Sequence, residues 1–168
     1  MAKINTLHEF LVEQLRDLYS AETQILANLP TMAKQTSHPD LRMAFEAHVR
    51  ETEQQKERLE RIATQMNFSP GGHTCAAMQG IAKEAQQWLA EAGTDDVRDA
   101  GLIANAQRVE HYEIAGYGTA RAIAERLGLA PVVALLEQTL QEEKATDQKL
   151  TRLALSSINE DAATNRSR

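Results

Sequence analysis

The sequence has only one cysteine, Cys75, in 168 residues. A single thiol can form neither an internal disulfide nor a metal site built from several thiolates, so the chain has no tetrathiolate iron centre of its own. Long apolar runs are also missing, because none approaches the ~20 residues that a membrane-spanning helix needs. The start, MAKINTLHEF, has neither the apolar stretch nor the cleavage site of a signal peptide. We therefore expect a protein of the reducing cytoplasm that does not associate with membranes.

Aromatic residues make up 4% of the chain, and there are only 8 glycines and 4 prolines. Alanine, leucine, glutamate and glutamine are plentiful instead, a balance that favours helices over strands. The length and the 42% of hydrophobic residues suit one domain, residues 1–168, with a core large enough to fold alone. The formal net charge of -6 argues against nucleic acid as a partner, since phosphate binding needs clustered lysine and arginine.

Apolar residues recur at helical spacing in four long segments, and no segment alternates as a strand does. Clusters of glycine, proline, serine and aspartate separate these segments. Gly128 follows the third segment, at the place of a C-terminal glycine cap. The sequence therefore predicts long helices over residues 4–35, 39–67, 96–127 and 131–158.

The segment 68–95 connects the second long helix to the third. Within it, HTCAAMQGIAKEAQQWLAEAG predicts a shorter helix that ends near Gly93. A long crossover between two helical hairpins is typical of ferritin-like bundles, whereas short turns throughout would give a simple up-and-down bundle. The predicted fold is all-α: a ferritin-like four-helix bundle of two antiparallel hairpins, joined by a long crossover that contains a short fifth helix. Residues 159–168 are expected to be a disordered tail.

Polar residues interrupt the apolar stripe of each long helix near its middle. At ~1.5 Å rise per residue the interruptions fall at similar heights along the four helices, so their side chains can meet in one central layer. They are Glu22 in the first helix, His48, Glu51 and Gln55 in the second, Glu110 and Glu113 in the third, and Glu143 and Asp147 in the fourth.

Six of these side chains are carboxylates. Burying them in ionised form costs several kcal/mol of solvation for each. The stripes offer no lysine or arginine to neutralise them, which leaves raised pKa values or metal ions. Two divalent ions reduce six negative charges to two, and two trivalent ions reduce them to none. Hard oxygen donors with little nitrogen and no thiolate suit iron or manganese. The pattern thus predicts a carboxylate-bridged site for two metal ions, with iron favoured and manganese as the alternative.

Other roles for these residues stay open. The carboxylates could form a solvated face or a water-filled polar cavity, although all four stripes would then have to be rotated. Gln55 and Asp147 can equally hydrogen-bond to a ligand as bind metal, and His48 can be a ligand or a core histidine. His111 lies ~100° round its helix from Glu110, so a flanking position is expected for it. Core packing is the favoured interpretation for Tyr19, Tyr112, Tyr117, Cys75 and Trp88.

Five motifs resemble those of the YciE/YciF-type stress proteins: LYSAETQ at 18–24, HVRETEQQKERLE at 48–60, CAAM at 75–78, AQRVEHYEIAGYGT at 106–119 and EEKATDQKL at 142–150. The resemblance covers residues 4–159, and VEHYEIAGYGT is quite specific. That family is ferritin-like and similar to rubrerythrins, whose di-iron site takes one Glu from the first helix, a Glu and a His from the second, E-x-x-E from the third and E-x-x-x-H from the fourth. The resemblance implies as glutamate ligands Glu22, Glu51, Glu110, Glu113 and Glu143.

The sequence departs from the rubrerythrin pattern at the histidines. Asp147 stands where the fourth helix has its histidine, and the second helix offers His48 before Glu51 or Gln55 after it. The site has thus lost at least one imidazole, which bears on iron affinity and on redox potential. A chain with one cysteine also lacks the rubredoxin centre of full rubrerythrins, so reducing electrons must come from an external donor.

These observations predict a stress-response protein with peroxide or dioxygen chemistry, or metal sequestration, at a dinuclear site bridged by Glu51 and Glu143. The alternative, favoured by the missing imidazoles, is a non-catalytic bundle that acts as a structural or interaction protein. An iron-storing cage would need a closed oligomer. Long bundles of this kind pair through exposed helix faces, so we expect a homodimer or a higher homo-oligomer.

Overall fold

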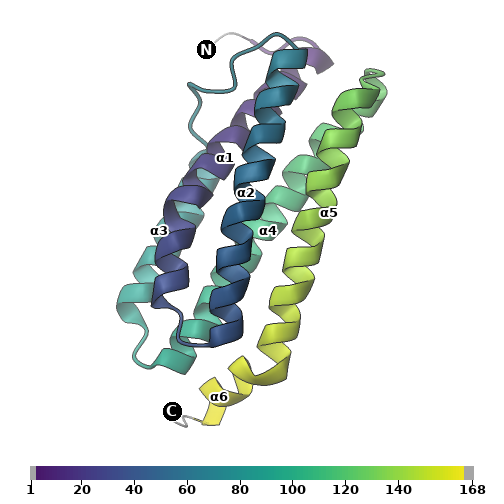
Figure 1. Ribbon diagram of the computed structural model, residues 1–168. Helices are drawn as coiled ribbons and strands as arrows, with labels where there is room; N and C mark the ends of the chain where they lie inside the picture. Colours follow the sequence, from purple (N-terminus) through teal and green to yellow (C-terminus); the bar gives the residue numbers. More distant parts are fainter. Residues whose placement is uncertain (1–2, 165–168) are drawn as a thin grey trace.

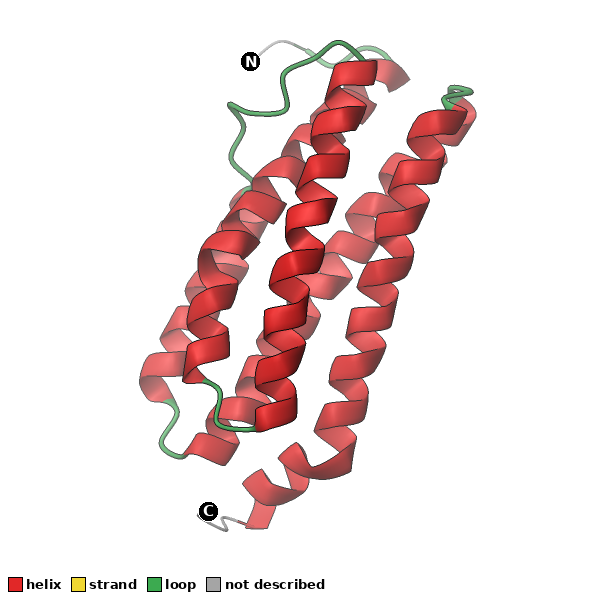
Figure 2. Ribbon diagram, viewed as in Figure 1, coloured by secondary structure: helices red, strands yellow, loops and turns green. Residues whose placement is uncertain are grey.

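The chain folds into a bundle of long helices that lie side by side (Figure 1). The computed structural model describes residues 3–164. Its long helices are α1 (Leu7–Gln35), α2 (Pro39–Gln65), α4 (Asp95–Arg126) and α5 (Ala130–Leu153), and the crossover contains α3 (Ala76–Glu91). No strand occurs in this part of the chain (Figure 2). The all-α fold predicted from the sequence is confirmed.

The path of the chain is that of a ferritin-like bundle. The helices α1 and α2 form one antiparallel hairpin, and α4 and α5 form the other (Figure 1). Between them the chain returns along the length of the bundle through α3, so that α2 and α4 run in the same direction. This arrangement requires the long crossover that the sequence predicts, because a short turn would make consecutive helices antiparallel.

Local signals set the helix ends. The Thr6 hydroxyl accepts a hydrogen bond from the backbone of Glu9, and the Glu9 carboxylate accepts one from the backbone of Thr6, which is a capping box. The first helix therefore begins at Leu7 rather than near residue 4. At the other hairpin, Gly128 has φ +72 and ends α4 as predicted, in a left-handed conformation that glycine adopts without strain.

Hydrogen bonds and buried contacts of Cys75 hold the crossover against the bundle at the start of α3. The Cys75 thiol is buried and accepts a hydrogen bond from the backbone of Met78, while the Cys75 backbone donates to the Ser20 hydroxyl at 2.9 Å. The Tyr112 hydroxyl lies 2.9 Å from the Cys75 sulfur and donates to Asp17. Burial raises the pKa of the Cys75 thiol, so the thiol stays protonated. These contacts confirm a packing role for Cys75.

The core has two apolar halves with a polar layer between them. One half is built around Leu29, Phe45, Met78, Leu102 and Leu150. The other half is built around Leu11, Leu15, Leu59, Ile62 and Leu136. The predicted site residues fall between these two clusters along the helices, so the apolar packing on either side fixes the height of the polar layer.

The end of the chain differs from the prediction. The last long helix was expected to reach residue 158, but α5 ends at Leu153 and continues as a π-helix over Ala154–Ile158. A further short helix, α6 (Asn159–Thr164), takes the place of the first part of the expected disordered tail. Ile158 is buried in the half of the core that contains Leu29 and Leu150, and this contact explains why the chain stays helical there. The rest of the expected tail, 165–168, lies outside the described residues.

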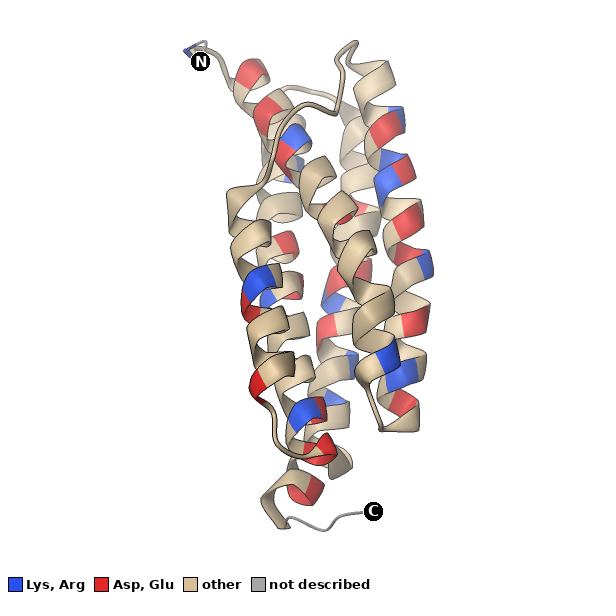
Figure 3. Cartoon of the chain, turned by 90° about the vertical axis from the view of Figure 1, so that its left-hand side faces the viewer, with Lys and Arg blue, Asp and Glu red and all other residues tan. Residues whose placement is uncertain are grey.

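Charged residues of both signs are mixed along the helices (Figure 3). None of the helices within residues 3–164 is both long enough and apolar enough to cross a membrane.

The C-terminal part of α3 depends on a glycine in α4. A Cβ atom at Gly101 would lie 1.8 Å from Nε1 of Trp88, so Gly101→Ala must displace the indole that packs α3 onto α4. We expect this change to lower the free energy of unfolding by about 1–3 kcal/mol. Trp88 is the only tryptophan, so its fluorescence should also shift to longer wavelength.

Gly80 provides the matched control for that substitution. It lies within α3, and a Cβ atom there would meet nothing within 4 Å. Gly80→Ala should therefore stabilise the protein by about 0.5–1 kcal/mol, the usual gain in a helix interior. Equal effects of the two alanines in urea unfolding would contradict the packing described for Trp88.

Candidate metal centre

Four metal-binding side chains meet in the polar layer: His48 from α2, Glu110 and Glu113 from α4, and Glu143 from α5. One ligand atom from each lies within 4.8 Å of the corresponding atoms of the other three. All four side chains are buried. Glu110 and Glu113 are three residues apart, and this spacing places both on the inner face of one helix. The two glutamates of the specific motif thus point into the core, as predicted.

Glu22 of α1 extends this group on one side. Its side chain is fully buried, and one of its oxygens accepts a hydrogen bond from the Tyr117 hydroxyl. After burial, the charge of Glu22 is the largest cause of the raised pKa of Glu113, so the two carboxyl groups lie close together. Tyr117 is therefore a hydrogen-bond partner of the site as well as a core residue.

Many buried polar atoms of this group have no hydrogen-bond partner among the described residues. They are Glu22 Oε2, both ring nitrogens of His48, Gln55 Oε1, Glu110 Oε2, both oxygens of Glu113 and Glu143 Oε2. Buried polar atoms are rarely left without partners, because each one costs ~1–3 kcal/mol. Here the unpaired atoms converge, and nearly all are of the type that binds iron or manganese. The residues present therefore fit a metal centre.

Burial dominates the electrostatics of these carboxyl groups. It raises the pKa of Glu22, Glu110 and Glu113 well above the ordinary value, and mutual repulsion with Glu143 adds to the shift for each. The pKa of Glu143 itself is raised to about 7, first by burial and then by Glu142 and Glu51. Protons thus compensate the buried carboxylates wherever no cation does.

His48 is held neutral. Burial, together with the charge of Lys149, lowers the pKa of its imidazole to about 4. The Nε2 atom lies 3.7 Å from Oε1 of Glu110, which is too long for a hydrogen bond. A neutral imidazole with an unpaired nitrogen is the form of histidine that binds metal.

The structure does not bring Glu51 and Asp147 into this group. Both are partly exposed, so the prediction that all six carboxylates are buried is wrong for these two. The inner stripe of α2 runs through His48, Thr52 and Gln55, which leaves Glu51 at its side, 3.5 Å from the Thr146 hydroxyl.

The side chain of Asp147 points toward α4. It accepts a hydrogen bond from Gln107 at 3.0 Å and lies 3.3 Å from the ring of His111. The His111 side chain is 69% exposed, which agrees with the flanking position predicted for it.

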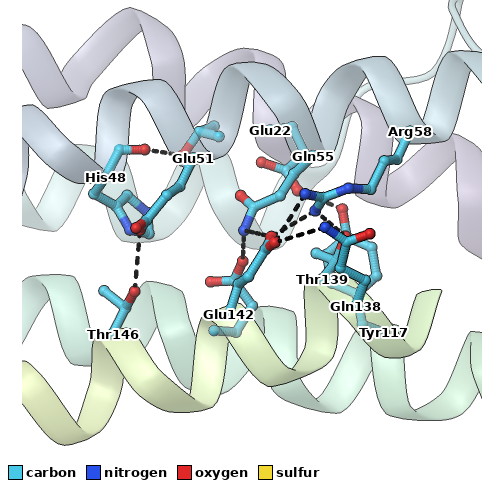
Figure 4. Close-up of polar contacts among 12 residues, drawn as sticks. Glu22, His48, Glu51, Gln55, Arg58, Tyr117, Gln138, Thr139, Glu142 and Thr146 are labelled. Carbon is cyan, nitrogen blue, oxygen red and sulfur yellow. Dashed lines mark hydrogen bonds and ion pairs between the residues drawn. The ribbon is translucent and has the colours of Figure 1, made fainter. Parts of the chain in front are cut away.

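A second polar network adjoins the group and was missed from the sequence (Figure 4). Arg58 of α2 is 6% exposed and donates hydrogen bonds to Thr139 at 3.0 Å and to Glu142 at 2.8 Å. Gln55 donates to both Glu142 and Glu143, so it links this ion pair to the metal-binding group. The prediction of stripes without arginine is wrong, because Arg58 follows Gln55 at helical spacing and is buried.

Arg58→Met tests the importance of this network. The change leaves the Glu142 carboxylate, 26% exposed, without its cation, and we expect a loss of about 1–3 kcal/mol in the free energy of unfolding. Arg61→Met, which alters an exposed arginine on the same helix, should have no measurable effect in urea unfolding. Equal losses for the two variants would show that Arg58 has no special role.

Comparison with known proteins places this arrangement in a family. Residues 6–163 match the family described as a domain of unknown function, DUF892. The chain belongs to the DUF892 family. It is 43% identical over 160 residues to protein YciF of Escherichia coli K12, and the match covers 95% of this chain and 96% of YciF. The resemblance to the YciE/YciF-type stress proteins is thereby confirmed.

Solved structures of DUF892 relatives have the same fold. The crystal structure of the E. coli stress protein YciF matches with a TM-score of 0.89 and covers 93% of this chain and 99% of YciF. YcfI of Rhodopseudomonas palustris, also 43% identical, matches with a TM-score of 0.86 over 89% of this chain and 95% of its own. A ferritin-like, diiron-carboxylate protein of Bacillus anthracis matches at 0.69 with 18% identity, over 89% of this chain and 99% of the other, which shows the ferritin-like fold alone.

Proposed function

We propose that the polar layer is a metal centre for two ions, with iron favoured and manganese as the alternative. The observation that carries the proposal is the convergence of unpaired, buried ligand atoms on His48, Glu110, Glu113 and Glu143. Glu22 lies beside this group and keeps one unpaired oxygen, as does Gln55. Glu113 has two unpaired oxygens and would be a ligand of the centre. Glu51 and Asp147, placed outside the group, have no ligand role in this proposal.

The charge of the centre favours divalent ions. The four buried glutamates carry four negative charges when ionised, and His48 is neutral. Two divalent ions would balance these charges, whereas two trivalent ions would leave two positive charges in the core. Uncompensated charge is costly in a buried site. The centre should therefore hold its metals in the divalent state more strongly than a site with six carboxylates would.

Iron or manganese in such a centre supplies redox chemistry with peroxide or dioxygen. The chain's own residues hold the ligands in place. Tyr117 donates a hydrogen bond to Glu22, and Gln55 donates one to Glu143. The Arg58–Glu142 ion pair holds Gln55 in turn. The two apolar halves of the core pack on either side of the layer and would keep water away from the centre.

The physiological role that we propose is a stress response, because the E. coli relative is a stress protein. Turnover would need an external electron donor, since the single cysteine offers no second redox centre. The cytoplasmic location, the homodimer or higher homo-oligomer and the absence of nucleic-acid and membrane partners stay predictions from the sequence.

A second candidate is a metal-free bundle with a structural or interaction role. It is favoured by one observation: His48 is the only imidazole in the group, where rubrerythrins have more. The two candidates differ in metal content. Protein purified without chelators from cells supplied with iron and manganese should contain close to two ions per chain by mass spectrometry of the elements. Folded protein with only traces of either metal would favour the second candidate, and so would a failure to consume peroxide or dioxygen after reconstitution with metal and an electron donor.

A further inference from the structure

A cavity of about 40 Å³ lies under the crossover helix α3, between it and the helices of the bundle. Its walls are mainly apolar and include Leu29, Phe45, Met78, Ile81, Val109 and Leu150. His48 and Glu110, two members of the metal-binding group, also line it. The cavity therefore lies between the polar layer and the apolar half of the core that contains Leu29 and Leu150.

The size of the cavity selects small guests. A water-sized probe needs roughly 10–15 Å³ of such volume, so the cavity has room for about three small atoms. Cavities with mainly apolar walls take up uncharged apolar guests.

Three amide groups in the wall already have hydrogen-bond partners, whereas the unpaired atoms of His48 and Glu110 belong to the metal-binding group. The Gln24 amide donates to the backbone oxygen of Cys75 at 3.0 Å, and the Asn28 amide donates to the backbone oxygen of Gln24 at 2.7 Å. The Asn105 amide donates to the backbone oxygen of Gly101 at 3.0 Å. Along the apolar wall, a polar guest such as hydrogen peroxide would lose its hydrogen bonds to water at a cost of a few kcal/mol. It could replace them only partly, beside His48 and Glu110. The apolar part of the lining thus favours a guest without hydrogen-bonding groups.

We propose that this cavity is a binding site for a small apolar molecule, namely dioxygen, beside His48 and Glu110. The significance of the site rests on the proposed metal centre, because dioxygen held there is in contact with two of its ligands. Dioxygen has two heavy atoms and no hydrogen-bond donor, so it fits both the volume and the lining.

The test uses metal-free protein, so that it does not depend on the metal centre. Dissolved dioxygen is paramagnetic and speeds the relaxation of nearby methyl groups in nuclear magnetic resonance. Under dioxygen pressure the methyl signals of Leu29, Met78 and Leu150 should be enhanced several-fold more than those of Leu15 and Leu136. All five are buried, but the last two lie in the other half of the core. Uniform enhancement across the five residues would overturn the proposal.

Ala85 allows the cavity to be filled from α3, which carries none of the residues proposed to bind metal. Ala85→Leu should abolish the selective enhancement, and the smaller Ala85→Val should reduce it. Ala90→Leu makes the same change at an exposed position of α3 and should leave the enhancement unchanged. If Ala85→Leu does not fold, xenon in crystals of the wild-type protein provides the second measurement. Xenon in the cavity supports the proposal, and its absence there contradicts it.

A failure of this proposal can be told apart from a failure of the metal centre. Wild-type protein that takes up dioxygen under α3 but binds no metal would contradict the proposed function only. Wild-type protein that binds metal but shows no selective enhancement would contradict the dioxygen site only.

Discussion

Glu113→Gln should stabilise the metal-free protein at pH 8 and weaken its metal binding at least about tenfold. Glu113 is fully buried, and neither of its oxygens has a hydrogen-bond partner within residues 3–164. Burial raises its pKa, and Glu22, Glu143 and Glu110 raise it further. Glutamine has nearly the same shape and needs no proton to be neutral. Relief of this buried repulsion is worth about 1–3 kcal/mol in the free energy of unfolding. Urea unfolding with chelator and a titration with Mn²⁺ would measure the two effects.

Glu51→Gln is the matched control for this substitution. It removes the same charge from the same kind of side chain, but Glu51 is partly exposed and lies outside the metal-binding group. We expect little change in either stability or metal affinity. If Glu51→Gln lost metal as strongly as Glu113→Gln, the bridging role predicted for Glu51 from the sequence would be correct and our placement of the centre would be wrong.

The free energy of unfolding of the metal-free protein should fall as pH rises above 4.5, and Glu143 adds to this slope up to about pH 7. Glu143 has a pKa of about 7 in the fold, and the pKa values of Glu22, Glu110 and Glu113 are raised further, against 4.5 for an unperturbed glutamate. Above pH 4.5 the unfolded chain has released these protons while the folded chain still binds them, so rising pH favours unfolding. Each group that stays protonated contributes about 1.4 kcal/mol per pH unit, and we expect a total loss of at least about 2 kcal/mol.

His48 makes this slope less steep below pH 6.5. Its pKa falls from 6.5 to about 4 on folding, so it destabilises the fold as pH drops below 6.5 and partly offsets the glutamates there. Above pH 6.5 it is neutral in both states. Urea unfolding at several pH values, with chelator present, gives the profile. Saturating Mn²⁺ should reverse the slope, because metal competes with protons for the same oxygens. A flat profile without metal would refute the electrostatics described for the centre.

The fold could be predicted from the sequence because several signals agree. Apolar periodicity gave the long helices, the glycine at 128 gave one turn, and the long segment 68–95 distinguished a crossover from a short turn. The π-helix over Ala154–Ile158 and the helix α6 could not be predicted in this way. They depend on the burial of Ile158 against other helices, which is a tertiary contact without a local signal.

The candidate site could be predicted in part. Glu22, Glu110, Glu113, Glu143 and His48 come together as the interrupted stripes indicate. For the second helix the stripe passes through either residue 51 or residue 52, and the structure selects Thr52. One position on a helix changes the direction of a side chain by ~100°, so sequence spacing alone could not decide between them.

The remaining site residues depend on side-chain choices between helices. Asp147 shares a face with Glu143, yet it is drawn aside by Gln107 and His111 of α4. The apolar part of the Arg58 side chain is buried in the core, and its guanidinium group is tolerated there because Glu142 on another helix accepts its hydrogen bonds. Such pairings leave no local pattern, because the residues are far apart in the sequence: 40 positions for Gln107 and Asp147, and 84 for Arg58 and Glu142.

The location of metal in crystals tests the central claim most directly. Crystals grown with Mn²⁺ or, without oxygen, with Fe²⁺ would be measured on both sides of the absorption edge of the metal. We predict anomalous peaks within the polar layer, among His48, Glu110, Glu113, Glu143 and Glu22. Crystals that show the fold but no peak there, or a peak only beside Glu51 and Asp147, would contradict the account.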